Sequence, residues 1–241
     1  MPGASYVALS GMRARLDQLD RLASDIANVG TAGYKGERTS DVQAERSPFD
    51  SALQTAIDVT TGSRRLDVTT GSIEPTGRPL DLAIQGKGFF AVETPAGVRY
   101  TRNGHFSRGT DGTLITDDGA SVLDAMSGTP ITVGKSGVGV DPDGTVHSDG
   151  SVAGKIQIVE FDDAGLLVRE NSSNMRADGM TAKPATKSSV ASGALEQSNV
   201  SVAERIAELT NLSRTFDALQ KAVSLQMNDL DGKAIDQLGR R

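Results

Sequence analysis

The sequence contains no cysteine and no tryptophan, and aromatic residues make up only 4% of it. The absence of cysteine excludes disulfides, cysteine-ligated metals and thiol chemistry. The hydrophobic fraction of 37% is low for one large globular core, in which apolar residues normally reach about 45%. Such a chain is expected to be elongated, or to complete its core with neighbouring molecules.

Long hydrophobic runs are also missing. No stretch reaches the length of about 18 apolar residues that a membrane-spanning helix needs. The N-terminal segment lacks the basic region followed by an apolar region that marks a cleavable signal peptide, so none is expected. The formal net charge of −6 argues against nucleic acid as a partner, because nucleic-acid binding needs a basic face.

Residue patterns that carry catalytic chemistry are sparse as well. The two histidines, His105 and His147, each lie next to a turn motif and lack the spacing of paired metal ligands. The glycines beside Lys87 lack the spacer and the hydroxyl residue of a phosphate-binding loop. No nucleophile–base pattern is present. We therefore expect no enzyme activity, no cofactor or metal, and no small-molecule substrate.

Apolar residues recur at spacings of three and four at both ends of the chain, which predicts two amphipathic helices. The first is expected over about residues 5–29. The second is expected to begin near residues 198–201, where Ser201 and Glu204 form the pattern of a capping box. Stripes this narrow are typical of helices that pack against one or two other helices. The stripes comprise Leu9, Met12, Leu16, Leu19, Ala23 and Ile26 in the first helix, and Val202, Ile206, Leu209, Leu212, Phe216, Leu219, Val223, Met227 and Leu230 in the second.

The centre of the chain has a different pattern. From about residue 80, short apolar and β-branched runs alternate with Asn-Gly and Asp-Gly dipeptides, which favour tight hairpins. No helical stretch separates the runs, so we expect an antiparallel all-β domain in an α+β chain. The expected organisation is an N-terminal helix in 1–35, an extended connector in 36–79, a central β-domain in 80–170, a second connector in 171–197 and a C-terminal helix in 198–241.

Three blocks of this sequence resemble one known family. "YVALSGM" (6–12) and "DIANVGTAGYK" (25–35) resemble its N-terminal signature, with matches at Asn28, Thr31, Gly33, Tyr34 and Lys35 and departures at Gly30 and Ala32. "PLDLAIQGKGFFAV", "YTRNGHF" and "GTLITDDGASVL" resemble its central domain. "ALEQSNVSVAE" and "SRTFDALQKAV" resemble its closing helix. With the blocks in this order, the chain resembles the rod and hook family of bacterial flagellar axial proteins, most closely the proximal-rod members.

The resemblance implies a fold and a function. The terminal helices are expected to pair as a coiled-coil-like domain, and the segment after Asn28 is expected to lead the chain out of the helix. Asn28 suits a helix end because its side chain can bond nearby backbone. Gly30 and Gly33 are expected to supply positive φ. The implied function is a structural subunit of the flagellar basal-body rod, which assembles with copies of itself and with other rod proteins into a helical tube.

The resemblance also implies a location and a route to it. The expected location is the rod of the flagellar basal body, which spans the periplasm. Members of this family leave the cell through the flagellar type III export apparatus. "FDSAL", from Phe49 to Leu53, resembles the short motif that such export substrates present, with Phe49 and Leu53 as its two key residues.

An exposed heptad stripe gains stability when a neighbouring copy buries it, so folding and assembly of the helices are expected to be coupled. A head-to-tail contact that does not close produces a helical array. The expected interface residues are Leu9, Met12, Leu16, Leu19, Ile26, Val202, Ile206, Leu209, Phe216, Val223 and Met227. Three alternatives stay open at this point: a distal-rod protein of the same family, a β-rich oligomeric adaptor module, and a secreted hydrolase.

Overall fold

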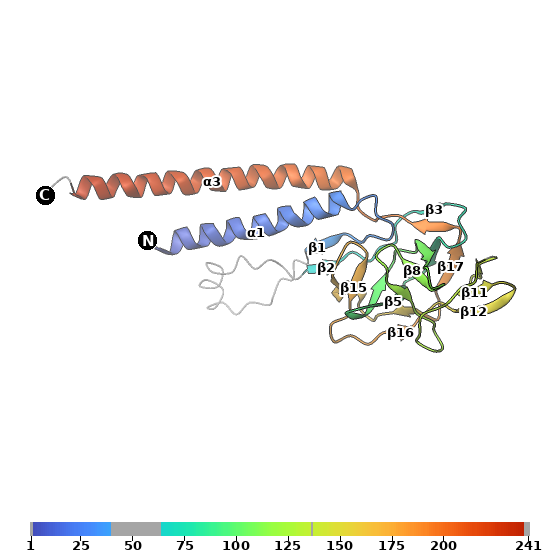
Figure 1. The fold of residues 1–241 in the computed structure, drawn as a ribbon. Helices are drawn as coiled ribbons and strands as arrows, with labels where there is room; N and C mark the ends of the chain where they lie inside the picture. The colour runs from blue at the N-terminus through green and yellow to red at the C-terminus, as the bar shows by residue number, and fades with distance from the viewer. Residues whose placement is uncertain (1, 40–63, 136, 239–241) are drawn as a thin grey trace. The chain divides into compact units, whose positions relative to one another are not determined.

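The computed structural model describes residues 2–39, 64–135 and 137–238 (Figure 1). The chain divides into two compact units. The first, the helical unit, consists of residues 1–26, 39–64 and 201–241; the second, the β unit, consists of residues 27–38 and 65–200.

The helical unit contains α1 (Pro2–Ala27) and α3 (Val202–Leu238). Ser201 precedes α3 as the sequence pattern predicts: its carbonyl accepts from the Arg205 N–H at 3.0 Å, and its hydroxyl lies 3.5 Å from the Glu204 N–H. The two helices contact each other through an ion pair, in which Arg205 Nε lies 3.2 Å from the buried carboxylate of Asp25.

The prediction of an α+β fold with paired coiled-coil-like helices is wrong. Between the two terminal helices the described chain is mostly β, and the described side chains of the helices show no closed heptad seam. Leu16, Val202 and Ile206, which the stripes placed at such a seam, are 47%, 40% and 50% exposed. Heptad spacing specifies an apolar face but not what covers it, so the periodicity is compatible with helices whose faces are left open within one chain.

The β unit is antiparallel, which agrees with the prediction for the centre of the chain. Its largest sheet has nine strands, with the order β14-β15-β6-β5-β9-β8-β7, and β13 pairs with both β5 and β16. These strands are β5 (Phe89–Thr94), β6 (Gly97–Thr101), β7 (Phe106–Arg108), β8 (Leu114–Thr116), β9 (Ser121–Val122), β13 (Ile158–Glu160), β14 (Val168–Arg169), β15 (Asn174–Arg176) and β16 (Lys183–Pro184). A single 3-10 turn, η1 (Ala164–Leu166), precedes β14.

Smaller sheets complete the architecture. β10 (Gly139–Val140), β11 (Thr145–Ser148) and β12 (Ser151–Lys155) form a three-stranded sheet. Three pairs join strands that are far apart in sequence: β1 (Glu37–Thr39) with β2 (Arg64–Leu66), β3 (Ile73–Pro75) with β18 (Ala194–Glu196), and β4 (Leu82–Gln85) with β17 (Ser189–Ser192). The segments predicted as connectors, 36–79 and 171–197, therefore contain strands.

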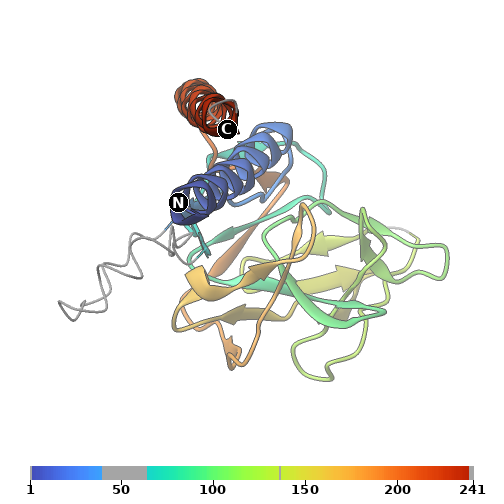
Figure 2. The same cartoon turned by 90° about the vertical axis from the view of Figure 1, so that its left-hand side faces the viewer.

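Strands from distant parts of the chain lie together in the β unit in both views (Figures 1 and 2), and their buried apolar side chains form two core clusters. The larger core cluster draws on β4, β5, β7, β8, β9, β11 and β17, with Leu82, Phe90, Phe106 and Val122 fully buried. A smaller cluster gathers around Phe89, Val159 and Met175. The predicted Asp-Gly turns are present at Gly112 and Gly144, whose φ angles of 91° and 87° suit the hairpins they close.

Candidate functional site

The end of the N-terminal signature block, residues 28–35, packs as part of the β unit and does not form a free loop. α1 ends at Ala27, and the Thr31 N–H then donates to the Asn28 carbonyl at 3.0 Å, which forms a turn. Gly33 N–H donates to the Glu196 carbonyl at 2.7 Å. The motif is thereby attached to β18, which immediately precedes the segment that leads to α3.

Gly33 occupies a position that only glycine fits. Its φ of 68° lies in the left-handed region, and a Cβ there would sit 2.2 Å from the backbone carbon of Arg102. Gly30 differs from the prediction, because its φ lies outside that region and a Cβ would meet nothing within 4 Å. The chain turns at Gly33 because the motif must pass directly over the Arg102 backbone.

Lys35, Arg102 and Glu196 form a buried ionic cluster beneath this turn. Lys35 Nζ lies 2.5 Å from Glu196 Oε1, and Arg102 Nη1 lies 3.2 Å from Glu196 Oε2. The three side chains are 0%, 2% and 0% exposed in the order Lys35, Arg102, Glu196. One carboxylate therefore serves two cations that come from distant parts of the chain.

Backbone groups bind further polar atoms of the cluster, although Arg102 Nε has no hydrogen-bond partner among the described residues. Lys35 Nζ donates to the Thr69 carbonyl at 2.7 Å, and Arg102 Nη2 donates to the Gly86 carbonyl at 2.8 Å. Glu196 Oε1 also accepts from the Gly71 N–H at 3.0 Å. The Arg102 guanidinium lies 4.9 Å from the centroid of the Phe89 ring, which adds a cation–π contact.

Burial dominates the electrostatics of the two cations. Desolvation lowers the pKa of the Lys35 ammonium and that of the Arg102 guanidinium, and the nearby Glu196 carboxylate partly offsets both effects. With two cations and one anion, the cluster has an excess positive charge in the interior. Removing its only carboxylate would therefore leave two buried charges without a counter-charge, which strongly destabilises the folded state.

Asn199 ties the same region together from the segment before α3. Its side chain accepts from the Gly36 N–H at 2.8 Å and donates to the Asp67 carbonyl at 2.7 Å and the Thr69 carbonyl at 3.2 Å. It thus contacts both the N-terminal motif and the segment after β2. We call Gly33, Lys35, Arg102, Glu196 and Asn199 together the clasp.

Tyr34 and Arg169 reinforce the clasp from the edge of the large sheet. Tyr34 is fully buried, and the Arg169 guanidinium lies 4.2 Å from the centroid of its ring. Arg169 also donates to the Tyr34 hydroxyl and to the Lys35 carbonyl. Three of the matching signature residues, Gly33, Tyr34 and Lys35, therefore act within one subunit and hold the motif on the β unit.

The predicted interface residues of the helices are less buried. In α1, Met12, Leu19 and Ile26 are half-buried, and in α3, Leu209 and Phe216 are half-buried. Leu16, Val202 and Ile206 are exposed. The side chains of Leu9, Val223 and Met227 lie outside those described, and so do Phe49 and Leu53.

Arg102, Arg169, Glu196 and Asn199 were not predicted as site residues. Arg102 lies in the quoted block "YTRNGHF", and Glu196 and Asn199 lie in "ALEQSNVSVAE". The resemblance therefore covered these residues but did not indicate what their side chains do. Within the described residues no group of histidine, aspartate and glutamate side chains could hold a metal ion. The clasp has the chemistry of an anchor, because each of its charges already has a partner inside the chain.

Neither α1 nor α3, over the residues described, has the length and apolar character needed to cross a lipid bilayer.

Comparisons with known proteins identify the family. Residues 83–153 match the D1 domain of the flagellar hook protein FlgE/F/G, and residues 191–236 match the C-terminal region of flagellar basal body rod FlgEFG proteins. The first match contains Arg102 and the second contains Glu196, Asn199 and most of α3.

Curated relatives match over nearly their whole length. The chain is 33% identical to the flagellar basal-body rod protein FlgF of Caulobacter vibrioides, covering 100% of this chain and 99% of the relative. It is 34% identical to FlgF of Rhizobium meliloti, with 97% of each chain covered. It is 32% identical to the flagellar basal-body rod protein FlgG of Bacillus subtilis, covering 91% and 93% of the two chains. Its sequence thus places this chain in the family of flagellar basal-body rod proteins.

Proposed function

We propose that this chain, a structural subunit of the flagellar basal-body rod, builds the proximal part of the rod. The opening motif "YVALSGM" supports the proximal position. The FlgF relatives, which match at 33% and 34% identity over essentially their whole length, support a subunit of similar size and organisation. The adaptor and hydrolase alternatives have no support in these comparisons.

The observation that carries the assembly proposal is the contrast between the two units. In the β unit, large apolar side chains such as Leu82, Phe90 and Phe106 are fully buried. In the helical unit, Leu16, Val202 and Ile206 leave 40–50% of their surface in water. Each Å² of apolar surface that a neighbour removes from water is worth about 25 cal/mol, so these faces favour association.

The neighbours are further rod subunits, either copies of this chain or other rod proteins. A head-to-tail contact between α1 of one copy and α3 of the next extends into a helical array when its rotation does not close a ring, and this is the contact we propose. The proposed contact residues are the apolar positions of the two stripes, from Leu9 to Ile26 and from Val202 to Met227. The clasp holds together the segment that follows α1 and the segment that precedes α3.

Export and final location belong to the same proposal. The chain is proposed to leave the cytoplasm through the flagellar type III export apparatus and to lie in the part of the rod that spans the periplasm. Phe49 and Leu53 are proposed as the export motif. A Phe49→Ala, Leu53→Ala double variant should accumulate inside the cell, and secretion at the normal rate would contradict this part of the proposal.

Hydrogen exchange of the unassembled chain and of isolated rods tests coupled assembly. In the unassembled chain, amides of α1 and α3 should exchange rapidly, whereas those of β5 and β6 should be protected. In rods, the helix amides should gain at least tenfold protection. Helices that are equally protected in both states would show that their faces need no neighbour, which would contradict the proposed role of the stripes.

A further inference from the structure

The tip of the β11–β12 hairpin places an aspartate in a strained conformation directly before a glycine. Ser148 of β11 pairs with Ser151 of β12, so Asp149 and Gly150 alone form the turn between them. Their φ angles of 52° and 79° are both positive, as a tight two-residue hairpin turn requires. Asp149 is the one non-glycine residue with positive φ in the part of the chain that the structure describes, and a Cβ is disfavoured in that conformation.

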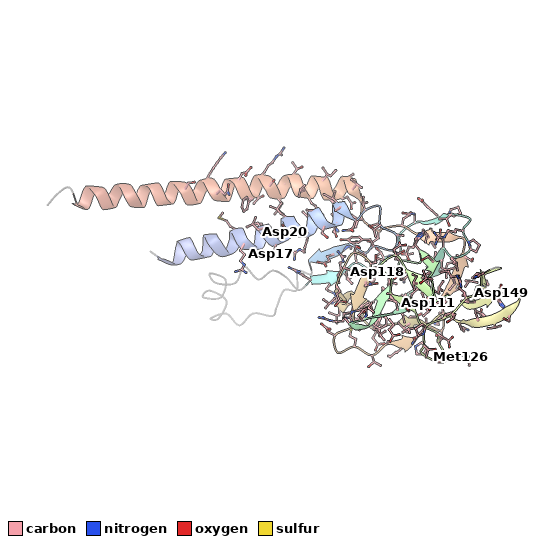
Figure 3. All side chains as sticks on the ribbon, in the orientation of Figure 1. Asp17, Asp20, Asp111, Asp118, Met126 and Asp149 are labelled. Carbon is pink, nitrogen blue, oxygen red and sulfur yellow. The ribbon has the colours of Figure 1, made fainter. Side chains whose placement is uncertain are left out.

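The Asp149 carboxylate accepts no hydrogen bond from any residue that the structure describes. It lies instead against Gly134, where an added Cβ would come within 1.6 Å of Asp149 Oδ2. The Gly150 N–H likewise has no acceptor within the described ranges. Both residues of the turn are exposed, and Figure 3 labels Asp149 at this hairpin. An unbonded carboxyl therefore precedes an unbonded amide in an exposed turn.

This arrangement permits an intramolecular reaction with water as the only other reactant. The Gly150 nitrogen attacks Cγ of Asp149, which forms an N–Cγ bond, and the carboxyl OH leaves with the amide proton as water. Glycine allows this attack because it has no Cβ in the way. A water molecule then opens the five-membered succinimide ring. Breaking the bond between the nitrogen and the main-chain carbonyl carbon gives isoaspartate, in which the chain runs through Cβ and Cγ.

Two other aspartate–glycine turns of the β unit hold their carboxylates with hydrogen bonds. Asp111 accepts from the N–H and the hydroxyl of Thr113 at 3.0 and 2.8 Å, and Asp143 accepts from the same groups of Thr145 at 3.1 and 2.9 Å. In both turns the following glycine N–H donates back to a carbonyl, at 3.1 and 2.9 Å. These bonds to the threonine N–H and hydroxyl lower the pKa of both carboxyls, so a smaller fraction is protonated and able to lose water.

Asp118 and Asp178, each also followed by glycine, are held by side chains. The Asp118 carboxylate accepts from the side-chain amide of Asn174, and the N–H of the next residue donates to a carbonyl at 3.0 Å. The Asp178 carboxylate accepts from Arg176 Nε and Nη2 at 2.5 and 2.8 Å, and this bonding lowers the pKa of the Asp178 carboxyl. In both cases the carboxyl is held away from the attack that the Asp149 carboxyl is free to undergo.

The asparagine–glycine dipeptide at 103–104 is held more tightly still. Asn103 is 6% exposed, and its Oδ1 accepts from the His105 N–H at 3.0 Å. A Cβ at Gly104 would lie 1.7 Å from the Leu82 carbonyl oxygen, so the backbone is closely packed there. A further aspartate–glycine dipeptide, at 231–232, lies in α3 among residues whose side chains are not described.

Ring closure also requires the Asp149 backbone to leave its turn conformation. The turn can open easily, because residues 149–152 are all exposed and an exposed hairpin tip has few buried contacts to lose. Opening also releases the strain of the positive φ at Asp149. The strain, the unbonded carboxyl and the exposed tip therefore act in the same direction at this one dipeptide.

We propose that Asp149 is a site of spontaneous modification, at which the folded chain forms a succinimide with Gly150 and then isoaspartate. This property belongs to the β unit and does not depend on the proposed assembly of the rod. Isoaspartate adds one methylene to the main chain of a two-residue turn. The present pairing of Ser148 with Ser151 is not compatible with the longer turn, so the modified hairpin tip should loosen.

Prolonged incubation of the folded full chain in water labelled with heavy oxygen tests the proposal, because each ring opening adds one labelled oxygen atom. Digestion in ordinary water and tandem mass spectrometry then locate the label and distinguish isoaspartate from aspartate. Asp149 should gain label at least tenfold faster than any of four comparison residues, which are Asp111, Asp118, Asp143 and Asp178. Equal rates at the five positions would overturn the proposal.

The same incubation in guanidinium chloride separates the effect of the fold from that of the local sequence. All five aspartates precede glycine, so their rates in the unfolded chain should lie close together. If Asp149 kept the same lead in the unfolded chain, the turn geometry would not be its cause, and the proposal would be overturned.

Arg176→Ala is the matched variant, because it removes both hydrogen bonds that Asp178 receives from Arg176. Labelling at Asp178 should rise at least fivefold in the folded variant, while labelling at Asp149 should stay as in the natural chain. An unchanged rate at Asp178 would show that hydrogen bonds to the carboxylate do not protect these dipeptides, which contradicts the reason given for the selectivity.

Discussion

The Lys35 ammonium and the Glu196 carboxylate, 161 residues apart in sequence, lie 2.5 Å apart in the interior of the β unit. Lys35 belongs to the segment that follows α1, and Glu196 belongs to the segment that precedes α3. The chain therefore enters and leaves the β unit at neighbouring points. The pairing of β18 with β3 and of β17 with β4 brings further early and late segments of the chain together within the β unit.

Glu196→Gln tests the ionic cluster. The substitution keeps the shape of the side chain but removes the only anion, so Lys35 and Arg102 remain buried without a counter-charge. Breaking a buried pair in this way costs about 3–5 kcal/mol. In urea denaturation, the free energy of unfolding of the β unit should decrease by this amount. Glu74→Gln, an exposed glutamate on the neighbouring strand β3, should change the free energy of unfolding by less than about 0.5 kcal/mol.

Gly33→Ala tests the close passage of the motif over Arg102. The added Cβ would meet the Arg102 backbone at 2.2 Å in a left-handed conformation, so we expect a loss of at least about 2 kcal/mol. Gly30→Ala is the matched control, since its Cβ would meet nothing within 4 Å and its φ is not left-handed. Thermal denaturation of the two variants should separate them clearly. Equal melting temperatures would contradict the geometry of the clasp.

Lys35→Met tests the electrostatic consequence of burial. The pKa of Lys35 is lowered in the folded chain, mainly by desolvation. Between that lowered value and the ordinary value of the unfolded chain, the unfolded state binds a proton that the folded state lacks. The contribution of Lys35 to the free energy of unfolding therefore rises with pH across that window and is constant below it.

The measurement is the difference in the free energy of unfolding between the natural chain and Lys35→Met, followed from pH 7 upward. The difference should shift in favour of the natural chain as the pH approaches the ordinary pKa of lysine. Because all other titrating groups are shared, their effects cancel to first order. A shift in the opposite direction would mean that the pKa of Lys35 is raised in the folded chain.

The parts that sequence reasoning predicted are those determined by local patterns. Heptad spacing placed the helices within a few residues of α1 and α3, and Asp-Gly dipeptides placed the turns at Gly112 and Gly144. Short-range signals suffice there, because turn and helix geometry depend on nearby residues.

The parts that were missed depend on long-range pairing. β17 and β18 read as polar connector because their partners, β4 and β3, lie more than 100 residues earlier in the chain. Lys35 lies in the N-terminal signature block and Glu196 in the C-terminal block, and nothing in the sequence distance between them indicates a contact. The coiled-coil prediction failed for a related reason: periodicity at Leu16 and Ile206 describes a face without identifying its partner.

The account depends most on the open helix faces, and one measurement tests it directly: the amount of chain in basal bodies isolated from cells that express Ile206→Asp. A carboxylate buried at a subunit contact should reduce incorporation at least tenfold, because an unpaired buried charge is costly. Thr215→Asp, at another exposed position about 180° around the same helix, is the control and should incorporate normally. Normal incorporation of Ile206→Asp, with the β unit folded in both variants, would contradict the proposed contact.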